Sequence, residues 1–409
     1  MLLDEVRADL ATQATDDLLP PQRRGQGLAA TDIERVALLT QRTAVAELRL
    51  ADGRAVIVPL VKDGRWRRAE ARDAISASGS SAPAPFEVSM SNLIPVMDAG
   101  VERAIEVDMS NELRVIDDTV VAKWQFALDP GSLAGPRMVK HLAQAGFTEM
   151  PVPLGYVTWD DCLIVSYTGF LPDAHDGWDW MLADVLRMLA GESGAPDWPA
   201  QLGSLVGRLH AAATQPTSVF PTPVGRADLA PLAGHYRRLL ATDLDPEMRG
   251  ALTPWSDRLA DALATVASAT DVQVVPLHGD LHPGQFLRWR EGIYVGDFDG
   301  NPLLPAAERG LPGPTAHDVA GLLRGLDHVA IAAARRMPHP EALGMGRAWA
   351  RRAREDTLSA YLDVKDVPSL DVPLLEALET LSPLHEAVYA AEYLPRWRYV
   401  PLAVLRGGP

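Results

Sequence analysis

The spacing of apolar residues along the chain changes near Trp178. Before this point, short apolar stretches alternate with polar residues around turn dipeptides such as Asp52-Gly53 and Asp117-Asp118, a pattern typical of β-hairpins. After it, in WDWMLADVLRMLAG and QLGSLVGRLHAAAT, apolar residues recur at the period of a helix that is buried on one face. The sequence therefore predicts an α+β protein in which a strand-rich lobe precedes a helix-rich lobe.

Composition breaks divide the chain further. The stretch SASGSSAPAP at 76–85 combines small polar residues with prolines and carries no apolar periodicity, which predicts a linker or an exposed loop. One helix is expected within the strand-rich part, from Pro136 to about Gly146, because proline suits a first turn and glycine suits the position after a last turn. The expected segments are a cap subdomain over 1–85, a strand-rich lobe over 86–170 and a helical lobe over 171–409.

The chain is acidic, with 38 Lys and Arg residues against 54 Asp and Glu residues and a formal charge of −16. This charge argues against nucleic acid and anionic membrane surfaces as partners. A single cysteine, Cys162, excludes an internal disulfide and a multi-cysteine zinc site. No stretch reaches the roughly 18 uncharged apolar residues of a membrane helix, and the start MLLDEVRADL does not match a signal peptide. The cytoplasm is the expected location, and a monomer is compatible with the sequence.

Side chains that can take part in catalysis or metal binding are concentrated in residues 274–302, VVPLHGDLHPGQFLRWREGIYVGDFDGNP. An apolar run ends at His278-Gly279-Asp280, a polar turn leads to Gln285, a hairpin is expected from FLRW and GIYVG, and Asp297 follows. This order allows Asp280, Gln285 and Asp297 to converge. Phosphoryl transfer needs such a set, because one carboxylate accepts the proton of an attacking hydroxyl while other oxygen atoms bind Mg²⁺ beside a triphosphate.

Two other interpretations of this stretch remain open from the residues alone. His278, Asp280 and His282 are residue types that bind zinc in hydrolases, although a zinc site leaves the motif DFDGNP without a role. The stretch can also be a turn-rich loop with solvated acids, although two motifs in this order argue against that interpretation. We expect His278 itself to pack and hydrogen-bond rather than to take part in chemistry.

HGDLHPGQ followed by DFDGNP resembles the catalytic loop and metal-binding motif of aminoglycoside-phosphotransferase-like kinases. Gln285 in place of the usual asparagine, the pair Glu308-Arg309 and the segments HDVAGLLR and VYAAEYLPRWRYVPLAVL are similar to the maltokinase group, and DFDGNP is similar to its glucosamine kinase branch. The resemblance spans nearly the whole chain, since VPLVKDGRWRRA matches the cap pattern, SNELRVIDDTVVAKW the lysine strand and DGWDWML the start of the helical lobe.

This resemblance implies a bilobal protein-kinase-like fold with an N-terminal cap that uses ATP and Mg²⁺. It implies that Asp280 is the catalytic base and that Gln285 and Asp297 bind the metal. It places Ser110 near the phosphates, although the sequence there has no G-x-G-x-x-G. In LIVSYTGFLP, residues 163–172, backbone groups of Val165 and Tyr167 are expected to hold the adenine edge; the alternative is a buried strand that runs into a linker.

Lys123 is one of only four lysines, and it lies within the apolar stretch TVVAKWQF. A lysine that points inward from a strand is costly unless an anion meets it, and the resemblance implies the α- and β-phosphates as that anion. The alternative is an edge-strand lysine that faces solvent. Protein-kinase-like folds pair this lysine with a glutamate on the next helix, but no acid occurs between Asp129 and Glu149, and Arg137 stands at the expected position.

The acceptor that the resemblance implies is a small sugar bound near Arg309. D-glucosamine, which would give the 6-phosphate, is the preferred acceptor, and maltose phosphorylated at its anomeric hydroxyl is the alternative. A catalytically inactive kinase fold that senses a sugar or a nucleotide is an alternative of another class. The complete set of Asp280, Gln285 and Asp297 argues against it, whereas the missing partner of Lys123 argues mildly for it.

Acceptor choice is expected to depend on YAAEYLPRW, residues 389–397. In maltokinase-like sequences the position that matches Glu392 is commonly basic, so a carboxylate here would suit the ammonium group of glucosamine. Tyr389 and Trp397 would supply an apolar wall for the sugar ring. The alternative places Glu392 on a solvated helix face near Arg396 and leaves the amine to Asp299 or Glu386.

Overall fold

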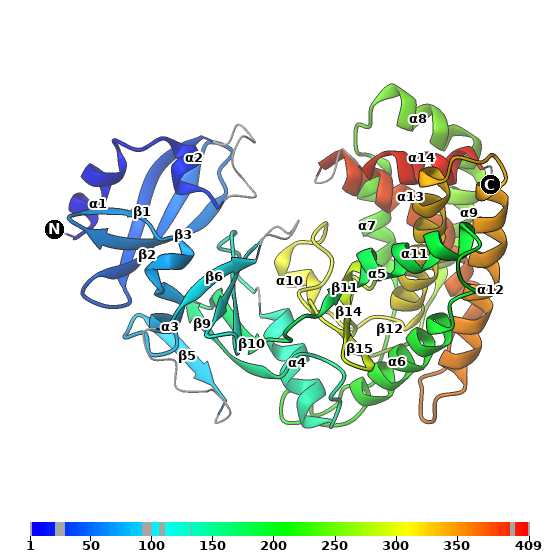
Figure 1. Ribbon diagram of the computed structural model, residues 1–409, viewed down its shortest axis with the longest axis horizontal. Helices are drawn as coiled ribbons and strands as arrows, with labels where there is room; N and C mark the ends of the chain where they lie inside the picture. Colours follow the sequence, from blue (N-terminus) through cyan, green and yellow to red (C-terminus); the bar gives the residue numbers. More distant parts are fainter. Residues whose placement is uncertain are drawn as a thin grey trace. The chain divides into compact units, whose positions relative to one another are not determined.

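The computed structural model describes residues 2–20, 29–91, 100–105, 111–131, 133–392 and 397–407. These residues form two compact units (Figure 1), one made of residues 1–136 and 151–172 and the other of residues 137–150 and 173–409. The expected boundary at residue 85 thus falls inside the first unit. The helix expected over 136–146 is α4 (Ala134–Gln144), and from Arg137 onward it belongs to the second unit.

The first unit begins with a four-stranded antiparallel sheet in the order β1-β2-β3-β4. The hairpin expected around Asp52-Gly53 is β2 paired with β3, and Gly53 has a positive φ of 86° that favours glycine at this turn. Leu10 of α1 and Leu18 of α2 join a core with apolar residues of these strands. The elements are α1 (Leu2–Leu10), α2 (Thr15–Leu18), β1 (Ala30–Leu38), β2 (Thr43–Leu50), β3 (Ala55–Asp63) and β4 (Arg65–Arg68).

A six-stranded antiparallel sheet completes the first unit, in the order β5-β9-β10-β8-β7-β6. Its central strands are rich in valine, isoleucine and aromatic residues, which suit a half-buried pleated surface. Ile116, Val120 and Ile164 are among the residues that pack together in its core. The elements are η2 (Ala71–Asp73), α3 (Ile75–Gly79), β5 (Phe86–Met90), β6 (Glu102–Ile105), β7 (Glu112–Ile116), β8 (Val120–Trp124), β9 (Pro153–Trp159) and β10 (Cys162–Gly169).

A buried cluster of charged side chains connects the two sheets. Arg68 of β4 pairs with Glu112 of β7, and the Nη2 atom of Arg114 lies 2.8 Å from the Oε1 atom of Glu112. Glu102 of β6 accepts hydrogen bonds from the backbone N–H of Ser76 at 2.7 Å and from its hydroxyl at 2.9 Å. Two guanidinium groups thus balance two carboxylates in the interior, which holds β4 and α3 against β6 and β7.

The linker expected at 76–85 is wrong over its first residues, because α3 includes Ser76, which is 0% exposed. Besides its bonds to Glu102, Ser76 accepts hydrogen bonds from the Nε1–H of Trp124 at 2.8 Å and, on its carbonyl oxygen, from the hydroxyl of Tyr167 at 2.7 Å. Small polar residues resemble a flexible loop in composition. Here their small size lets the backbone approach the sheet, and the serine satisfies buried polar groups.

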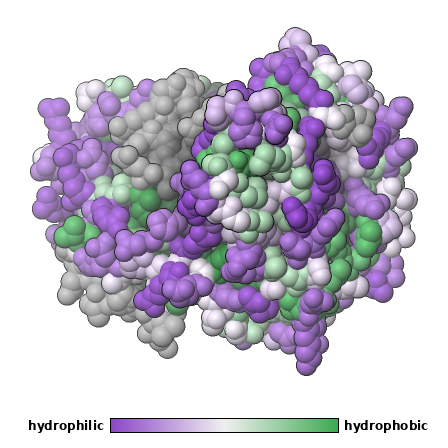
Figure 2. Space-filling model, turned by 45° about the vertical axis from the view of Figure 1, so that its right-hand side comes forward, coloured by the Kyte–Doolittle hydropathy of each residue, from purple (hydrophilic) through white to green (hydrophobic). Residues whose placement is uncertain are grey.

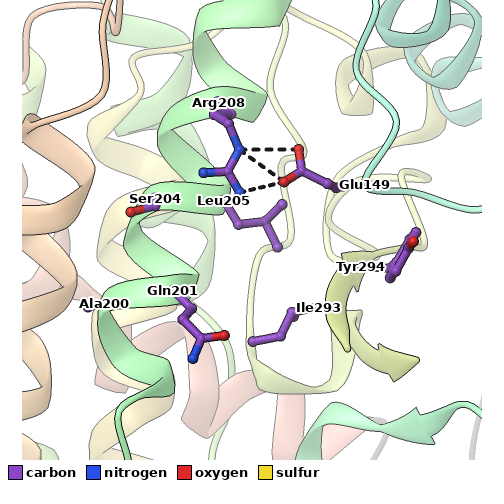
Figure 3. Close-up of a pocket in the computed structure, with 9 residues that line it drawn as sticks. Glu149, Ala200, Gln201, Ser204, Leu205, Arg208, Ile293 and Tyr294 are labelled. Atoms are coloured by element: carbon purple, nitrogen blue, oxygen red, sulfur yellow. Dashed lines mark hydrogen bonds and ion pairs between the residues drawn. The ribbon is translucent and has the colours of Figure 1, made fainter. Parts of the chain in front are cut away.

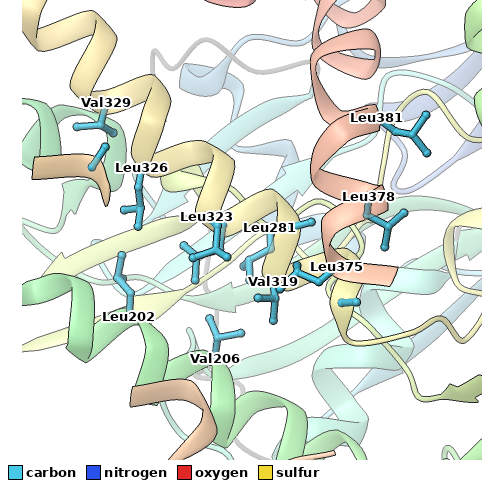
Figure 4. Packing of buried hydrophobic residues seen from close by; sticks show 14 of the residues in the cluster. Leu202, Val206, Leu281, Val319, Leu323, Leu326, Val329, Leu375, Leu378 and Leu381 are labelled. Carbon is cyan, nitrogen blue, oxygen red and sulfur yellow. The ribbon is translucent and has the colours of Figure 1, made fainter. Parts of the chain in front are cut away.

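The second unit is mostly helical. Its core lies between α6, α11 and α13, and Leu281 from the loop after β13 joins the leucines and valines of these helices (Figure 4). The helices are α5 (Gly177–Leu189), α6 (Trp198–Ala213), α7 (Ala230–Leu240), α8 (Pro246–Leu252), η3 (Thr253–Trp255), α9 (Ser256–Ser268), η4 (Pro283–Gln285), α10 (Ala306–Arg309), α11 (Ala316–Arg336), α12 (Ala342–Leu362), α13 (Val372–Glu392) and α14 (Tyr399–Arg406).

Two small sheets accompany these helices. One has the order β11-β14-β15, from His175–Asp176, Phe286–Trp289 and Gly292–Val295, and the other pairs β12 (Gly225–Ala227) with β13 (Val272–Val274). The β14–β15 pair is the hairpin expected from FLRW and GIYVG.

The surface is mixed, and Figure 2 shows hydrophilic side chains interspersed with smaller apolar groups on the face that it presents. Among the described residues, every helix is too short or too polar to cross a membrane. The cytoplasmic location and the monomeric state that we expect from the sequence stay predictions.

The buried charge cluster predicts a large asymmetry between single and double replacements. Glu112→Leu leaves Arg68 and Arg114 with one carboxylate, so we expect the free energy of unfolding to fall by about 3–5 kcal/mol. The double replacement Arg68→Met/Glu112→Leu keeps the cluster neutral, so its free energy of unfolding should fall by less. Urea denaturation of the three proteins measures this difference, and equal losses in the single and double variants would contradict the proposed charge balance.

Candidate active site

The loop 278–285 follows β13 and is held mainly by backbone contacts. The Nε2 atom of His278 lies 2.8 Å from the carbonyl oxygen of Gly296, and its ring packs against Phe298 with centroids 4.9 Å apart. These contacts agree with the structural role expected for His278. The next residue but one, Asp280, keeps 25% of its side chain exposed and can therefore meet a ligand.

Asp318 at the start of α11 fixes the turn that carries Asp280. Its Oδ2 atom accepts the N–H of His278 and its Oδ1 atom the N–H of Gly279, both at 2.9 Å. The Nε2 atom of His210 on α6 lies 3.2 Å from the same carboxylate, which is only 1% exposed. Burial alone would raise the pKa of Asp318, but the hydrogen bonds from His210 and His317 hold it far below its usual range. Asp318 is therefore a buried anion that serves as an anchor for the loop.

Gln285 and Asp297 come together at the open end of the β14–β15 hairpin. Phe286 pairs with Val295, and the N–H of Gly296 donates to the carbonyl oxygen of Gln285 at 2.8 Å. Gln285 therefore stands directly before the last pair of the hairpin, and Asp297 directly beyond Gly296. An amide oxygen and a carboxylate are ligands that suit Mg²⁺, so the donor set at this end fits that ion.

His282 links Asp280 to Gln285. Its Nε2 atom lies 3.9 Å from the Oδ2 atom of Asp280 and 3.1 Å from the side-chain amide of Gln285. The structure thus brings the three residues expected for phosphoryl transfer into one place. The alternative zinc site is wrong for the part of the chain that the structure describes, because no three His, Cys, Asp or Glu side chains there are placed to hold a metal ion.

Asp280 has the electrostatics of a base that is active near neutral pH. Burial raises its pKa to about 7, and the negative charges of Asp297 and Asp318 act in the same direction. His278 and His317 act in the opposite direction. A carboxyl group with a pKa near the working pH can accept a proton from a hydroxyl and release it again.

A set of side chains that the sequence did not single out lies on α7, α11 and α13. His235 is 3% exposed, and within the described chain neither of its ring nitrogens has a hydrogen-bond partner. Its ring centroid lies 6.2 Å from that of His385, whose ring stacks on Tyr389 at 6.5 Å. The Nε2 atom of His328 lies 2.8 Å from the Oε2 atom of Glu386. Burial lowers the pKa of His235 to about 4 and that of His385 to about 3.

These histidines are far apart in the chain and match no motif, so only the fold reveals that they gather. Electrostatic interactions connect His385 with His282, and His317 with both His235 and Asp280. The cluster therefore lies close to the loop that carries Asp280, and its neutral imidazoles can donate and accept hydrogen bonds.

Lys123 lies on β8, between Leu113 of β7 and Ser166 of β10. The alternative of an edge-strand lysine is therefore wrong. Val165 and Tyr167 lie inside β10, which pairs with β8 on one side and β9 on the other, so their backbone groups face neighbouring strands. This placement contradicts their expected contact with the adenine edge and supports the alternative of a buried strand. Ser110 lies outside the described residues.

The expected acceptor residues differ in how they are placed. Arg309 donates from Nε to the carbonyl oxygen of Leu304 at 3.0 Å and from Nη2 to that of Pro302 at 3.3 Å, so it braces its own loop. Trp397 meets the ring of Trp178 edge-on with centroids 4.4 Å apart. Glu392 is the last residue of α13, and its side chain lies outside the described part of the structure.

A surface pocket of about 410 Å³ lies elsewhere in the second unit (Figure 3). Arg208 of α6 and Glu149 form a two-pronged ion pair at its wall, with Nε to Oε1 at 2.9 Å. None of the residues expected for catalysis lines this pocket. Its other lining residues are Ala200, Gln201, Ser204, Leu205, Gly292, Ile293 and Tyr294.

Comparison with known proteins gives consistent results. Residues 103–353 match the model of the phosphotransferase enzyme family. The chain is 35% identical to a glucosamine kinase of Streptacidiphilus jiangxiensis, over 96% of both chains. It is 36% identical to a glucosamine kinase of Mycolicibacterium smegmatis, over 85% of this chain and 92% of the relative.

Solved structures agree with these relatives. A glucosamine kinase structure matches with a TM-score of 0.79 and 31% identity, covering 98% of this chain and 96% of the other. A glucosamine kinase in complex with glucosamine, ADP and inorganic phosphate matches with a TM-score of 0.73 and 30% identity, covering 98% of both chains. These findings confirm the family resemblance and the α+β fold class that the sequence predicted.

Helix α11 approaches the 278–285 loop so closely that a side chain at Gly321 would disturb it. A Cβ atom there would lie 2.6 Å from the carbonyl oxygen of Leu281, and one at Gly325 would meet the ring of Pro283. We expect Gly321→Ala to lower the free energy of unfolding by about 1–3 kcal/mol, because backbone cannot yield as a flexible side chain does.

Gly344 provides the control for this prediction. It lies in α12 with open space around it, so Gly344→Ala should raise the free energy of unfolding by about 0.5–1 kcal/mol, because alanine has the higher helix propensity. Chemical denaturation of both variants tests the contact, and a Gly321→Ala protein as stable as Gly344→Ala would rule it out.

Proposed function

The chain belongs to the phosphotransferase enzyme family, and on that basis we propose that it is an ATP-dependent glucosamine kinase that forms glucosamine 6-phosphate. The observation that carries the proposal is the likeness, over nearly the full length, to glucosamine kinases, one of them solved with glucosamine and ADP. A maltokinase is less well supported, because the two relatives described above are glucosamine kinases. The grouping of Asp280 with Gln285 and Asp297 argues against an inactive sensor.

The proposed reaction is an in-line transfer to a hydroxyl group. The 6-hydroxyl oxygen attacks the γ-phosphorus, the bond from that phosphorus to the β–γ bridging oxygen breaks, and ADP leaves. Asp280 accepts the proton that the hydroxyl loses. Its anchor, Asp318, keeps the carboxylate in position because it binds the two preceding N–H groups.

The residues proposed to bind the nucleotide are Lys123, Gln285 and Asp297. Lys123 lies on the central strand β8 and is the proposed contact of the α- and β-phosphates. Gln285 and Asp297 would hold Mg²⁺, which when bound supplies positive charge beside the phosphates. β10 ends at Gly169, and the N–H of Phe170 still donates to the carbonyl oxygen of Thr119 at 2.8 Å, so Leu171 and Pro172 replace Val165 and Tyr167 as candidates for the adenine edge.

The sugar is proposed to lie on the side of the 278–285 loop that faces the histidine cluster. Tyr389 and Trp397 provide aromatic surface, and Glu392 would accept hydrogen bonds from the ammonium group. Glu386 beside His328 is a second carboxylate in this region. Two donors of the Arg309 guanidinium group bind carbonyl oxygens of its own loop, and its contact with the sugar stays a prediction.

Replacing Asp280 with asparagine tests the catalytic base. We expect kcat to fall by about 10²–10⁴ while ADP affinity stays close to that of the wild type, because asparagine keeps the shape but accepts no proton. A coupled assay of ADP release with glucosamine, maltose and glucose measures kcat and identifies the acceptor. Near-normal turnover in the variant would remove Asp280 from this role, and turnover on maltose alone would refute the proposed acceptor.

The same variant has an expected effect on stability that does not depend on activity. The pKa of Asp280 in the folded protein, about 7, lies above its ordinary value of 3.8, so the folded state holds a proton that the unfolded chain releases. This contribution to stability is complete below pH 3.8 and is lost as the pH rises through 7. The Tm of Asp280→Asn relative to the wild type should therefore rise between acid and neutral pH.

Replacing Glu392 with glutamine tests how the amine is recognised. The KM for glucosamine should rise at least ~10-fold and any activity on glucose should stay unchanged, because only glucosamine carries an ammonium group. Glu376→Gln, at an exposed position on the same helix, is the matched control. Equal losses on both sugars would show that Glu392 supports the site in general.

A further inference from the structure

His282 makes two hydrogen-bonding contacts within its own loop. It precedes the short helix η4, and its Nδ1 atom accepts the N–H of Gly284 at 3.2 Å. The other ring nitrogen, Nε2, lies 3.1 Å from the side-chain amide nitrogen of Gln285. One imidazole therefore contacts both the backbone of the turn and a residue proposed to bind Mg²⁺.

The contact of Nδ1 with Gly284 determines whether Nε2 donates or accepts in its contact with Gln285. A neutral imidazole carries its proton on one nitrogen and accepts on the other. Because Nδ1 accepts from Gly284, the proton is on Nε2, which can only donate. The amide nitrogen placed beside it is also a donor, and two donors form no hydrogen bond. The donor and acceptor roles therefore require the amide of Gln285 to be turned over, so that Oε1 takes this position and the shape of the side chain stays the same.

Asp280 does not compete with Gln285 for the Nε2–H group of His282. The distance from Nε2 to the Oδ2 atom of Asp280 is 3.9 Å, which is beyond a hydrogen bond. The proton on Nε2 is therefore directed to Gln285. An amide oxygen has two lone pairs, so Oε1 can accept this hydrogen bond and still coordinate a cation.

The chemistry of glutamine makes such a donor necessary. An aspartate or glutamate ligand offers oxygen in both orientations, whereas a glutamine that turns over would present its N–H groups to the metal. Imidazole and other donors that hydrogen-bond to ligating groups orient these groups in metal sites. Asp297 lies directly beyond Gly296, the backbone partner of Gln285, so a correctly oriented Oε1 complements its carboxylate.

We propose that His282 is a positioning residue that donates its Nε2 proton to Oε1 of Gln285 and so keeps the amide oxygen available for Mg²⁺. The inference rests on the proposed kinase function. It assigns His282 no direct contact with the reacting atoms.

Two replacements separate the roles of the two ring nitrogens. In His282→Asn, the side-chain oxygen can still accept the N–H of Gly284, since asparagine is a good helix cap, but nothing reaches the position of Nε2. In His282→Gln, the longer side chain carries its amide nitrogen to the position of Nε2 and restores the donor. The asparagine variant thus preserves the turn, and the glutamine variant preserves the proposed function.

Calorimetric titration with ADP, with Mg²⁺ and with the metal chelated, measures the effect without any turnover. With Mg²⁺, we expect His282→Asn to bind ADP about 10-fold more weakly than the wild type and His282→Gln to bind within about threefold. With the metal chelated, the three proteins should bind alike. In a Gln285→Ala background, His282→Asn should cause no further loss, because the oxygen that it positions is gone.

Other results would overturn the inference. Wild-type affinity in His282→Asn would show that the donor is not needed. Equal losses in both variants would show that the ring merely supports the turn, and a further loss in the Gln285→Ala background would show that His282 acts elsewhere. If the wild type itself bound ADP no better with Mg²⁺ than without, the proposed kinase function would fail, a result distinct from any difference between variants.

Discussion

The carboxylate of Asp318 is the interaction on which the rest of the site depends. It lies in the core of the second unit and binds the N–H groups of His278 and Gly279. Gly279 has a φ of 82°, a conformation that favours glycine, so the turn needs both this residue and an acceptor for its N–H groups. Without Asp318, two buried N–H groups would lose their partner and the turn before Asp280 would lose its shape.

Asp318 is in turn held by the helices around it. His210 of α6 contacts the carboxylate through Nε2 and the hydroxyl of Tyr361 on α12 through Nδ1, at 2.9 Å. A chain of polar groups thus crosses the apolar core from α12 through α6 to the loop. Because every member has a partner, the chain orients the loop without leaving an unpaired charge in the interior.

The carboxyl groups of Asp318 and Asp280 lie in the same region but differ in how readily they bind a proton. Hydrogen bonds hold the pKa of Asp318 low, whereas burial without comparable donors raises that of Asp280 to about 7. Asp318 therefore remains an anion over the whole working range, and Asp280 can gain and lose a proton. The negative charge that anchors the loop also raises the pKa of Asp280, so structure and reactivity are connected through one residue.

The sequence was sufficient to predict the parts of this site that lie close together in the chain. Asp280, Gln285 and Asp297 flank a single hairpin, so local pairing rules bring them together. The same rules predicted β2–β3 around Asp52-Gly53. Contacts between distant segments were not predictable, such as the link from His210 to Asp318, or the gathering of His235 with His385. No local pattern distinguishes these histidines from solvated ones.

Predictions from composition also failed where residues typical of loops are buried in the structure. Ser76 belongs to a stretch typical of loops, yet it is buried because Glu102, Trp124 and Tyr167 all bond to it. The adenine edge is expected at Val165 and Tyr167 because residues 163–172 fall between the two lobes that the sequence predicts. The register shows that the strand continues through them, because sheet pairing on both sides uses the backbone groups that a ligand would need.

Both units bury charged side chains, and in both these charges are balanced by polar partners in the interior. In the first unit, Arg68 and Arg114 balance Glu102 and Glu112, and two of these residues, Glu112 and Arg114, lie on β7 beside the strand of Lys123. In the second, Asp318 is balanced by backbone N–H groups and histidines behind Asp280. In the first unit, apolar residues of equal size in place of all four charged groups would give comparable stability, since burying charge is costly even when it is paired. The polar groups add orientation, because hydrogen bonds fix the direction of the backbone where apolar packing tolerates small shifts, and the proposed base Asp280 would need a defined orientation toward its substrate.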